Sequence, residues 1–567
     1  MVVGKILPNT LNTVYNMLIE GTKPMSKSGS NNFIKHGSIL AIASILSRII
    51  GLLYRIPMTA IIGDEANGLY SYAFEVYSIA LILSSYSMPL AVSKLLSAKF
   101  ARKEYSNGYK IFKCAMIFST ISGFVMALAI FFLAPLIEKL SNYNGLTFPL
   151  RVLSPTIFVV AIAGTLRGFF QSRKTMIPTA ISQLVEQVIN ALVSIGAAAA
   201  FVGISATAIE KISGGAAGGT MGTLAGALIS LIFLFVVFFA YKPRFMKHVR
   251  HDRSRTKDSN AEIAKMLVVT IIPVILSQAV YQASGVIDGS LFGNLYDGDN
   301  TETTFLYGLY SSKYRVLVNV PNAIASAMAS SMIPVLVGLW SIGNYTDFRN
   351  KLAISIKTNM IIAFPCAVGL GVLASPIMRL LFPTTDYTMS GAMLSWGAVA
   401  VIFYSLSTVT NAALQGMDKM NRPVIHSAIS LVIHIVLVVL LLKFSCLGVY
   451  ALVIGNVTFP LLVCILNWIA VAKEARYRQE IKTSFLIPAA ASIAMGLVCF
   501  IISKLFSLIP GHYYGVTVIS VVICIVVAIP VYFALLFLLK GLNHEDLKNF
   551  PMGLRIERIA KKFKLMR

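Results

Sequence analysis

Apolar runs of about 20 residues follow one another along almost the whole chain, and short polar stretches separate them. A helix of that length crosses the hydrocarbon core of a bilayer, which is about 30 Å thick. The strands of a membrane barrel would give shorter segments of alternating polarity instead. The pattern therefore predicts an all-α polytopic membrane protein with fourteen transmembrane helices. These are expected at 35–58, 68–98, 110–135, 150–170, 178–203, 220–241, 263–290, 304–339, 350–375, 389–414, 422–443, 446–472, 484–508 and 514–539.

The polar stretches between these helices divide by charge. The stretches that follow even-numbered helices are rich in Lys and Arg, and they cover 99–113, 242–265, 473–482 and 540–567. The stretches after odd-numbered helices carry acidic residues at 63–65, at 297–302 and at Asp386. Because Lys and Arg concentrate on the cytoplasmic side of membrane proteins, both termini are expected in the cytoplasm.

Short motifs recur at a nearly constant offset. Gly68-Leu69-Tyr70 returns as Gly308-Leu309-Tyr310, and Gln171 with Pro178 returns as Gln415 with Pro423, at offsets between 240 and 245. The offset predicts two pseudo-symmetric six-helix lobes of the same orientation, as in transporters built from parallel repeats. The expected parts are a tail at 1–32, lobes at 33–241 and 263–472 joined by a basic cytoplasmic linker at 242–262, two further helices within 473–540, and a basic tail at 541–567.

The composition narrows the class of protein. The chain of 567 residues is 57% hydrophobic and 13% charged, with a net charge of +25. In a chain so apolar, the positive excess is a topology signal and an attraction to anionic headgroups, and no motif that reads bases accompanies it. The six cysteines lack metal-ligand spacing. Enzyme motifs for phosphate binding, zinc proteolysis or a nucleophilic serine are absent, so we expect neither an enzyme nor a nucleic-acid-binding protein. The Gly-rich stretch 214–222 opens the sixth helix and is interpreted as a flexible outer loop and close helix packing.

Two arginines stand inside the first apolar run. Arg48 and Arg55 are seven residues apart, which is close to two helical turns, so both project from one face, with Ser44 and Gly51 beside them. Arginine keeps its charge, and placing it at membrane depth costs several kcal/mol even on lenient scales, roughly 2.5–3.5. Two on one face indicate a water-filled cavity that attracts anions.

Other charges fall at similar depths. At 1.5 Å per residue, Arg48 lies about 20 Å and Arg55 about 30 Å from the cytoplasmic surface. Glu75 on the second helix reaches the depth of Arg55, so we expect the two to lie close together. Lys313 and Arg315 on the eighth helix lie roughly 14–17 Å below the outer surface. Arg48 and Arg315, from opposite lobes, are the expected core of a cationic site at the interface of the repeats.

The remaining polar residues of the spans suggest ion coupling or structural roles. Asp288 with Asn456 and Thr458 could form a sodium site, and Glu186 is a further candidate for ion coupling. Arg167 lies near a cytoplasmic helix end, where we expect it to snorkel to the interface.

The first helix also carries a family resemblance. The segment Ser47-Arg48-Ile49-Ile50-Gly51-Leu52-Leu53-Tyr54-Arg55, with Gly68-Leu69-Tyr70 and the fourteen expected helices, resembles the multidrug/oligosaccharidyl-lipid/polysaccharide (MOP) exporter superfamily. Within it, the chain resembles MurJ-like lipid II flippases and the branch of stage V sporulation protein B and polysaccharide-biosynthesis proteins. The resemblance extends over nearly the whole chain.

The resemblance implies two six-helix lobes around a cationic cavity, alternating access, and a groove of the last two helices for a polyprenyl tail. The family's paired arginines correspond to Arg48 and Arg55, and its eighth-helix cation corresponds to Lys313 or Arg315. The chain departs from some lipid II flippases at Ile56, where they carry an acid, and at 83–87, where they carry an arginine.

We therefore expect a flippase for a polyprenyl-pyrophosphate-linked sugar in the bacterial cytoplasmic membrane. Its expected substrate-binding residues are Arg48, Arg55, Glu75, Lys313 and Arg315. No cofactor is expected, and Na⁺, H⁺ or the membrane potential alone remain alternatives for the energy source. Expected partners are membrane lipids, the lipid-linked substrate and enzymes of envelope synthesis, with the chain as a monomer.

Three alternatives stay open from the sequence. A cation-coupled drug antiporter of the same fold would use the carboxylates Glu75, Glu186 and Asp288. A facilitator-type transporter would carry a Gly-x-x-x-Asp-Arg/Lys motif after its second helix, and 99–104 lacks it. A scaffold without transport would tolerate the loss of Arg48 and Arg55.

Overall fold

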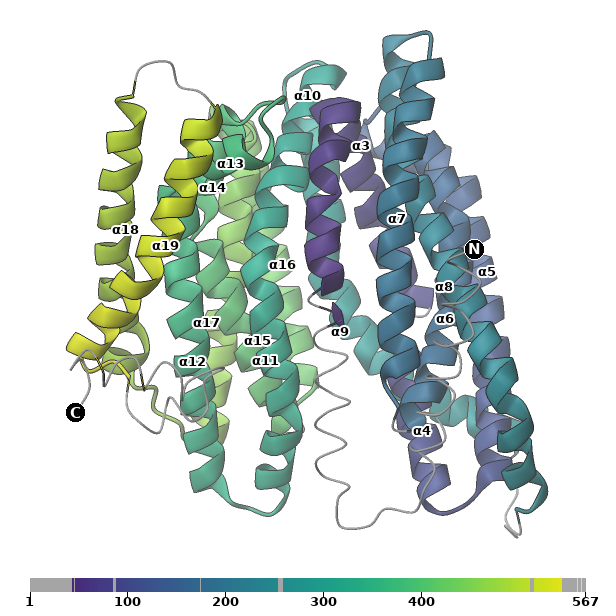
Figure 1. The fold of residues 1–567 in the computed structure, drawn as a ribbon. Coiled ribbons are helices and arrows are strands. Elements are labelled where there is room, and N and C mark those ends of the chain that lie inside the picture. Colours follow the sequence, from purple (N-terminus) through teal and green to yellow (C-terminus); the bar gives the residue numbers. More distant parts are fainter. Residues whose placement is uncertain are drawn as a thin grey trace. The chain divides into compact units, whose positions relative to one another are not determined.

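The computed structural model describes residues 43–44, 46–84, 88–173, 175–252, 259–509 and 514–542, together with 558 and 562. It divides into two compact units, Met1–Gly293 (unit 1) and Asn294–Arg567 (unit 2), which are drawn in Figure 1. The predicted tails at 1–32 and 541–567 lie almost entirely outside the described residues.

Unit 1 consists of helices, and residues 46–53 form the described part of the first one. The following helices are α3 (Arg55–Ser84), α4 (Met88–Ala101), α5 (Tyr105–Ser141), α6 (Thr147–Ser172), α7 (Ile177–Ile204), α8 (Ala208–Arg250) and α9 (Asn260–Leu295). α8 continues well into the basic segment 242–262 that the sequence predicts as a linker.

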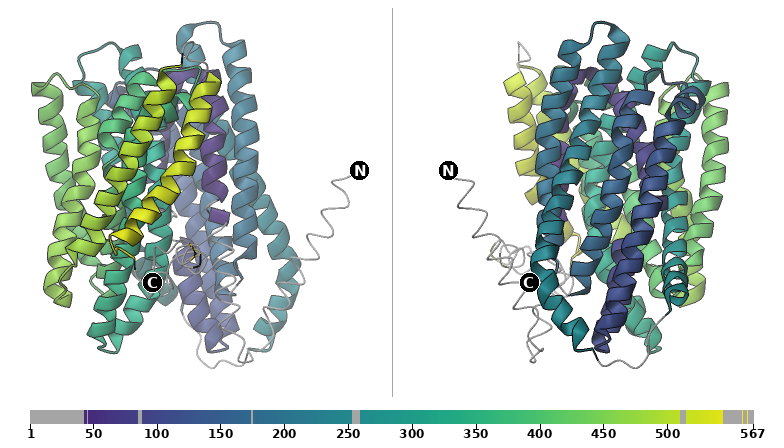
Figure 2. Two further views of the ribbon diagram at one scale, coloured as in Figure 1. Left: turned by 60° about the vertical axis from the view of Figure 1, so that its left-hand side comes forward. Right: turned by 90° about the vertical axis from the view of Figure 1, so that its right-hand side faces the viewer.

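Unit 2 is also helical. Its helices are α10 (Asn300–Gly308), the π-helix η1 (Leu309–Tyr314), α11 (Arg315–Ser341), α12 (Tyr345–Val372), α13 (Ala374–Leu381), α14 (Thr388–Gly397), α15 (Ala400–Gly416), α16 (Asn421–Phe444), α17 (Tyr450–Ala475), the π-helix η2 (Lys482–Leu486), α18 (Ile487–Ser507) and α19 (Tyr514–Leu538). Figure 2 shows α18 and α19 side by side as the final hairpin.

The all-α prediction is confirmed for the described part of the chain, which contains helices and no strand. Ten of its helices are long and apolar enough to cross a membrane, and eleven if the bent pair α14 and α15 counts as one. The protein is therefore a multi-pass membrane protein. The count of fourteen spans and the two-lobe arrangement stay predictions.

A single glycine separates the first two predicted spans. The helix runs from residue 46 to Ile62, because Tyr54 N donates to Ile50 O and Met58 N donates to Tyr54 O. Gly63 then adopts φ 78° and ψ 174°, a region that only glycine occupies readily, and the next helix begins at Asp64. The polar stretch at 63–65, expected as a connection between two spans, thus contains a single non-helical residue, Gly63.

The predicted eighth and tenth spans are broken helices. The eighth consists of α10, η1 and α11, and the π-helical turn η1 contains Lys313 and precedes Arg315. The tenth bends by 46° between α14 and α15. Short π-helical segments disturb the regular backbone pattern and are frequent at functional sites.

The core of unit 1 includes the start of α9. Ile263, Leu267 and Ile271 are buried with residues of α4, α5, α6 and α8. Tyr143 donates to Gly289 O over 3.0 Å, and a side chain at Gly293 would overlap Ser141. The sequence repeat begins its second half at residue 263, whereas the compact units divide after Gly293. The repeat-based lobes stay a prediction.

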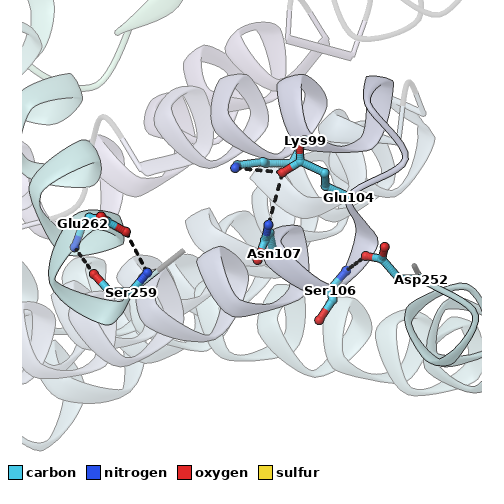
Figure 3. Close-up of polar contacts among 7 residues, drawn as sticks. All are labelled: Lys99, Glu104, Ser106, Asn107, Asp252, Ser259 and Glu262. Atoms are coloured by element: carbon cyan, nitrogen blue, oxygen red, sulfur yellow. Dashed lines mark hydrogen bonds and ion pairs between the residues drawn. The ribbon is translucent and has the colours of Figure 1, made fainter. Parts of the chain in front are cut away.

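Polar contacts organise the end of unit 1 at the turn between α4 and α5 (Figure 3). Glu104 accepts hydrogen bonds from Lys99 over 2.9 Å and from Asn107 over 3.1 Å, and these bonds hold the pKa of its carboxyl below its usual value. Ser106 N donates to Asp252 just beyond α8. Ser259 and Glu262 form a reciprocal cap at the start of α9. The contacts connect the basic turn to both neighbouring helices.

The Gly-rich stretch 214–222 is not a flexible loop. It lies within α8, and its glycines let α8 approach α7 closely. An added Cβ at Gly218 would lie 2.6 Å from the Cα of Ala198, and one at Gly222 would lie 2.5 Å from the carbonyl oxygen of Asn190. Small residues that let backbones approach closely are how membrane helices gain packing energy.

We expect Gly222→Ala to lower the apparent Tm of the detergent-solubilised protein by several degrees, because overpacking a close helix contact costs about 1–3 kcal/mol. Gly196→Ala in α7 is the matched control, since an added Cβ there meets no atom of the described chain within 4 Å. Alanine favours helix more than glycine, so the control should hold or raise the Tm. Equal Tm values for both variants would contradict this account of the packing.

Candidate functional site

The first helix separates its charged residues from its lipid-like face. Arg48 is exposed and Arg55 is half-buried. Leu46, Ile49 and Leu53 are 43%, 47% and 56% exposed. At about 100° per residue, this apolar stripe is centred roughly 140° around the helix from the two arginines. The exposed apolar stripe suits contact with hydrocarbon, and the arginines lie on the opposite side.

Aromatic residues hold Arg55. Its guanidinium carbon lies 5.8 Å from the centre of the Tyr70 ring, within the range of a cation–π contact. The hydroxyls of Tyr54 and Tyr70 are hydrogen-bonded over 2.9 Å, and both rings are buried. Arg55 is thus fixed by α3, whereas Arg48, two turns earlier, remains exposed.

A polar face of α7 lies beside the arginine stripe. Gly51, which shares that stripe, lies 3.7 Å from Gln187 Oε1, measured from an added Cβ. Gln183 and Gln187 are one turn apart, and Asn190 follows on the same face. Among the described residues, Ser47 Oγ and Gln183 Oε1 are buried without a hydrogen-bond partner. Buried polar atoms of this kind are usually satisfied, so they mark a place where water or a ligand would complete the bonding.

The two acids predicted near the outer side pack inside unit 1. The carboxylate of Glu75 lies against Gly285 of α9, where an added Cβ would overlap it. Asp288, one turn further along α9, is 3% exposed. The expected proximity of Glu75 to Arg55 stays a prediction, and the contact that the structure gives to Arg55 is the ring of Tyr70.

Glu186 is ion-paired with Arg167. The pair joins Arg167 Nη2 to a Glu186 carboxylate oxygen over 2.6 Å, with 12% and 21% of the side chains exposed. Arg167 also donates to Ser182 over 3.0 Å and to Ser230 over 2.9 Å, so it connects α6, α7 and α8. The expected snorkelling of Arg167 is wrong, because a carboxylate and two hydroxyls solvate its charge within the helix bundle.

The two cations of the eighth span have different surroundings. Lys313 is fully buried, and its Nζ donates to Asp386 O over 2.5 Å and to Thr385 Oγ1 over 3.1 Å. Arg315 is half-buried, with its guanidinium carbon 5.9 Å from the centre of the Tyr310 ring. Lys313 thus fastens η1 to the segment before α14, and Arg315 is the more accessible cation.

The expected sodium ligands of unit 2 have protein partners. Asn456 accepts from Tyr314 over 3.1 Å and donates to Tyr404 over 3.0 Å. Thr458 donates to Gly455 O of its own helix over 3.2 Å. In the described part of the chain, three or more His, Cys, Asp or Glu side chains nowhere gather as a metal site. Asp288 belongs to unit 1, so the sodium site stays a prediction.

Sequence reasoning missed two groups of polar residues. Gln183 and Gln187 stand in the predicted fifth span, and their one-turn spacing was a usable signal. Lys357 is 8% exposed in α12, inside the predicted ninth span, where a lysine is costly and hence informative. Unit 2 also contains an apolar cavity of about 290 Å³ between α15 and α17, lined in part by Phe403, Leu461 and Trp468.

Comparison with known families identifies the chain. The family model described as "Polysaccharide biosynthesis protein" matches residues 33–340, and a second model, MatE, matches 273–440. The first match covers more than half of the chain, so the protein belongs to the polysaccharide biosynthesis protein family. This places it in the MOP exporter superfamily, with the MurJ-like and stage V sporulation protein B branches as its relatives, as the sequence predicts.

Two relatives from Bacillus subtilis (strain 168) align with most of the chain. The lipid II flippase MurJ is 25% identical over 427 residues, which cover 73% of this chain and 78% of the relative. Stage V sporulation protein B is 24% identical over 527 residues, which cover 92% of this chain and 98% of the relative. These named relatives include a flippase and no enzyme.

Solved structures share the fold. A lipid II flippase MurJ in an inward closed conformation aligns with a TM-score of 0.62 at 16% identity, over 88% of this chain and 97% of that one. An inward-facing multidrug resistance MATE family transporter aligns with a TM-score of 0.59 at 16% identity, over 76% and 98%. At this identity the likeness defines the fold alone.

We expect Arg167→Met to lower the apparent Tm by a few degrees, because it leaves the Glu186 carboxylate without its cation. Removing one partner of a fully buried pair costs about 3–5 kcal/mol, and this partly exposed pair should lose less. The double variant Arg167→Met/Glu186→Leu should recover much of the loss.

Arg151→Met is the control on the same helix, since Arg151 is exposed and bonds only weakly, to Phe131 O over 3.4 Å. A double variant no more stable than Arg167→Met would show that the pair is not coupled in this way.

Proposed function

We propose that the protein is a flippase for a polyprenyl-pyrophosphate-linked sugar, which it moves across the bacterial cytoplasmic membrane by alternating access. The observation that carries the proposal is the arginine stripe of the first helix, with exposed Arg48 and anchored Arg55 opposite a lipid-like face. The kinship with MurJ and stage V sporulation protein B supports this substrate class. Lipid II or a related polysaccharide precursor is the proposed cargo.

The chemistry of the cargo explains why arginine is used. A pyrophosphate carries several charges, and moving it through hydrocarbon without compensation is prohibitive. Guanidinium groups replace its water with charge-assisted and often bidentate hydrogen bonds, and they keep their charge when buried. The amide groups of Gln183 and Gln187 supply further bonding beside the arginines, suited to sugar hydroxyls or phosphate oxygens.

In unit 2 we assign the substrate role to Arg315 rather than Lys313. All of the Lys313 side chain is buried, and its ammonium is bonded to Asp386 and Thr385. Arg315 remains half-buried beside Tyr310. The proposed substrate-binding residues are Arg48, Arg55 and Glu75 in unit 1 and Arg315 in unit 2.

The proposal also includes a path for the substrate tail, the side of the membrane on which the termini lie, and the oligomeric state. The long apolar tail of the substrate would travel in the groove proposed for 473–540 and need not enter a polar cavity. The charge bias of the loops supports a cytoplasmic position for both termini. The chain acts as a monomer that receives its cargo from envelope-synthesis enzymes.

A second candidate function is a cation-coupled drug antiporter of the same fold. The similarity of a MATE transporter's fold and the MatE family match favour it. Such a protein needs accessible carboxylates, yet Glu186 is ion-paired and Asp288 is 3% exposed. Glu75, which is half-buried, is the remaining candidate carboxylate, and the exposed Arg48 favours an anionic cargo.

We expect Arg48→Gln to lower the initial rate of translocation about tenfold or more, because a charge-assisted hydrogen bond contributes about 1.5–3 kcal/mol. The assay follows a fluorescent polyprenyl-pyrophosphate sugar in proteoliposomes, where an impermeant quencher reports the outer leaflet. Arg151→Gln is the control for removing one exposed arginine, and it should keep the wild-type rate. Full activity of Arg48→Gln, with uptake of an organic cation that Glu75→Gln abolishes, would favour the antiporter.

We expect an inside-negative potential to accelerate outward movement of the pyrophosphate lipid. Each transferred charge gains about 2.3 kcal/mol per 100 mV, so a net charge of two supplies several kcal/mol without an ion gradient. Potassium-loaded vesicles with valinomycin set the potential, and vesicles with equal potassium on both sides are the reference. A rate that ignores the potential and follows a sodium or proton gradient would assign the energy to ion coupling.

A further inference from the structure

A cavity lined by both polar and apolar side chains lies where α18 meets α19 in unit 2. Its volume is about 230 Å³. α13 contributes one wall, and Figure 1 shows α13 near the labelled end of the hairpin where α19 begins. The hydroxyl of Tyr514, at the start of α19, donates to Leu380 O over 2.9 Å and fastens the two elements together. The cavity is thus formed within one compact unit.

The lining combines one cation with many hydroxyl groups. Its polar members are Ser375, Arg379, Tyr387, Ser503, Ser507, Thr517 and Ser520. The guanidinium carbon of Arg379 lies 5.7 Å from the centre of the Tyr387 ring, which orients the side chain. Among the described lining residues there is no carboxylate. Asp386, the nearest acid in sequence, accepts from the backbone N–H groups of Met389 and Ser390.

Guanidinium and hydroxyl donors together suit a phosphate group. Arginine binds phosphate through paired N–H donors, and serine and threonine hydroxyls complete its coordination. The volume is below the roughly 300–1,000 Å³ of pockets for drug-sized ligands, so it suits a head group and excludes a whole glycan.

The surroundings supply a place for an attached chain. On α18, Phe500 and Leu505 are 50% and 60% exposed, and on α19 Ile519 is 53% exposed. These apolar side chains lie within a turn of the cavity residues Ser503 and Ser520. A molecule with a phosphate head and a long hydrocarbon chain can therefore place its head in the cavity and its chain along α18 and α19.

We propose that this cavity binds the phosphate head of a membrane lipid at the end of the hairpin, which the loop charges predict to be the outer side. The cavity belongs to unit 2 and the arginine stripe to unit 1, and lipid binding at the cavity is measured without transport. Its phosphate has two possible sources, a bilayer phospholipid or a polyprenyl phosphate.

Photoreactive lipids test the site in the full-length protein reconstituted in vesicles. Phosphatidate is compared with diacylglycerol of the same chains, and polyprenyl phosphate with the corresponding polyprenol. Labelled peptides that contain 375–387 or 503–520 are quantified by mass spectrometry. We expect the phosphate-bearing lipids to label these peptides at least several-fold more than their neutral counterparts.

Arg379→Gln should lower this phosphate-dependent labelling about tenfold, and Arg379→Lys should retain part of it. Lys504→Gln is the matched control, because Lys504 lies on α18 beside Phe500 and outside the cavity lining. The nearly isosteric Thr517→Val should lower the labelling as well, which keeps the test valid if Arg379→Gln folds poorly.

The two lipid arms identify the source of the phosphate. Labelling by phosphatidate that polyprenyl phosphate does not compete away supports a bound phospholipid. Labelling that polyprenyl phosphate displaces supports a carrier-lipid site. Equal labelling by the neutral lipids, or labelling unchanged in Arg379→Gln and Thr517→Val, overturns the proposal. A loss of translocation in Arg48→Gln has no bearing on these outcomes, so the two proposals can fail separately.

Discussion

Charge desolvation is the constraint on which this structure depends. A guanidinium or ammonium inside an apolar span is tolerated only where other groups replace its water. Arg167 obtains a carboxylate and two hydroxyls, Lys313 a carbonyl and a hydroxyl, and Arg55 the face of an aromatic ring. Arg167 joins α6 to α7 and α8, Lys313 joins η1 to the segment before α14, and Arg55 is held within α3, so each charge also fixes the packing around it.

Close helix contacts supply the remaining order. Lipid tails are as apolar as leucine, so burial of apolar area alone gives little preference for one helix pairing over another. The glycines of α8 allow its backbone to approach that of α7, which also carries Glu186 and the two glutamines. The polar face of α7 is therefore held by a contact that a single added methyl group would disturb.

Composition and periodicity predict the all-helical membrane class and the approximate helix positions, because about 20 apolar residues are an unambiguous signal. The superfamily comes from the resemblance of the first-helix segment Ser47–Arg55 to a known family. Composition and periodicity do not predict local backbone geometry or contacts between helices. Gly63 is a single non-helical residue that kinks the chain between two helices. The Gly-rich stretch 214–222 is helix, since tertiary packing stabilises glycines that local propensity assigns to a loop. Arg167 was misjudged because depth along a helix does not reveal its partner on another helix. Gln183 and Gln187 were overlooked because neutral amides draw less attention than charges.

The distinction between Lys313 and Arg315 shows what side-chain surroundings add to a sequence motif. The two residues are two positions apart, so in a helix they project to nearly opposite sides, and the π-helical turn at Leu309–Tyr314 alters the register between them. Lys313 donates its hydrogen bonds to protein groups and has no exposed surface, whereas Arg315 retains accessible surface. Arg167 and Arg48 differ in the same way within unit 1. A cation whose donors are occupied by protein groups would have to break those bonds to bind a phosphate, so binding is favoured at the cations that remain accessible.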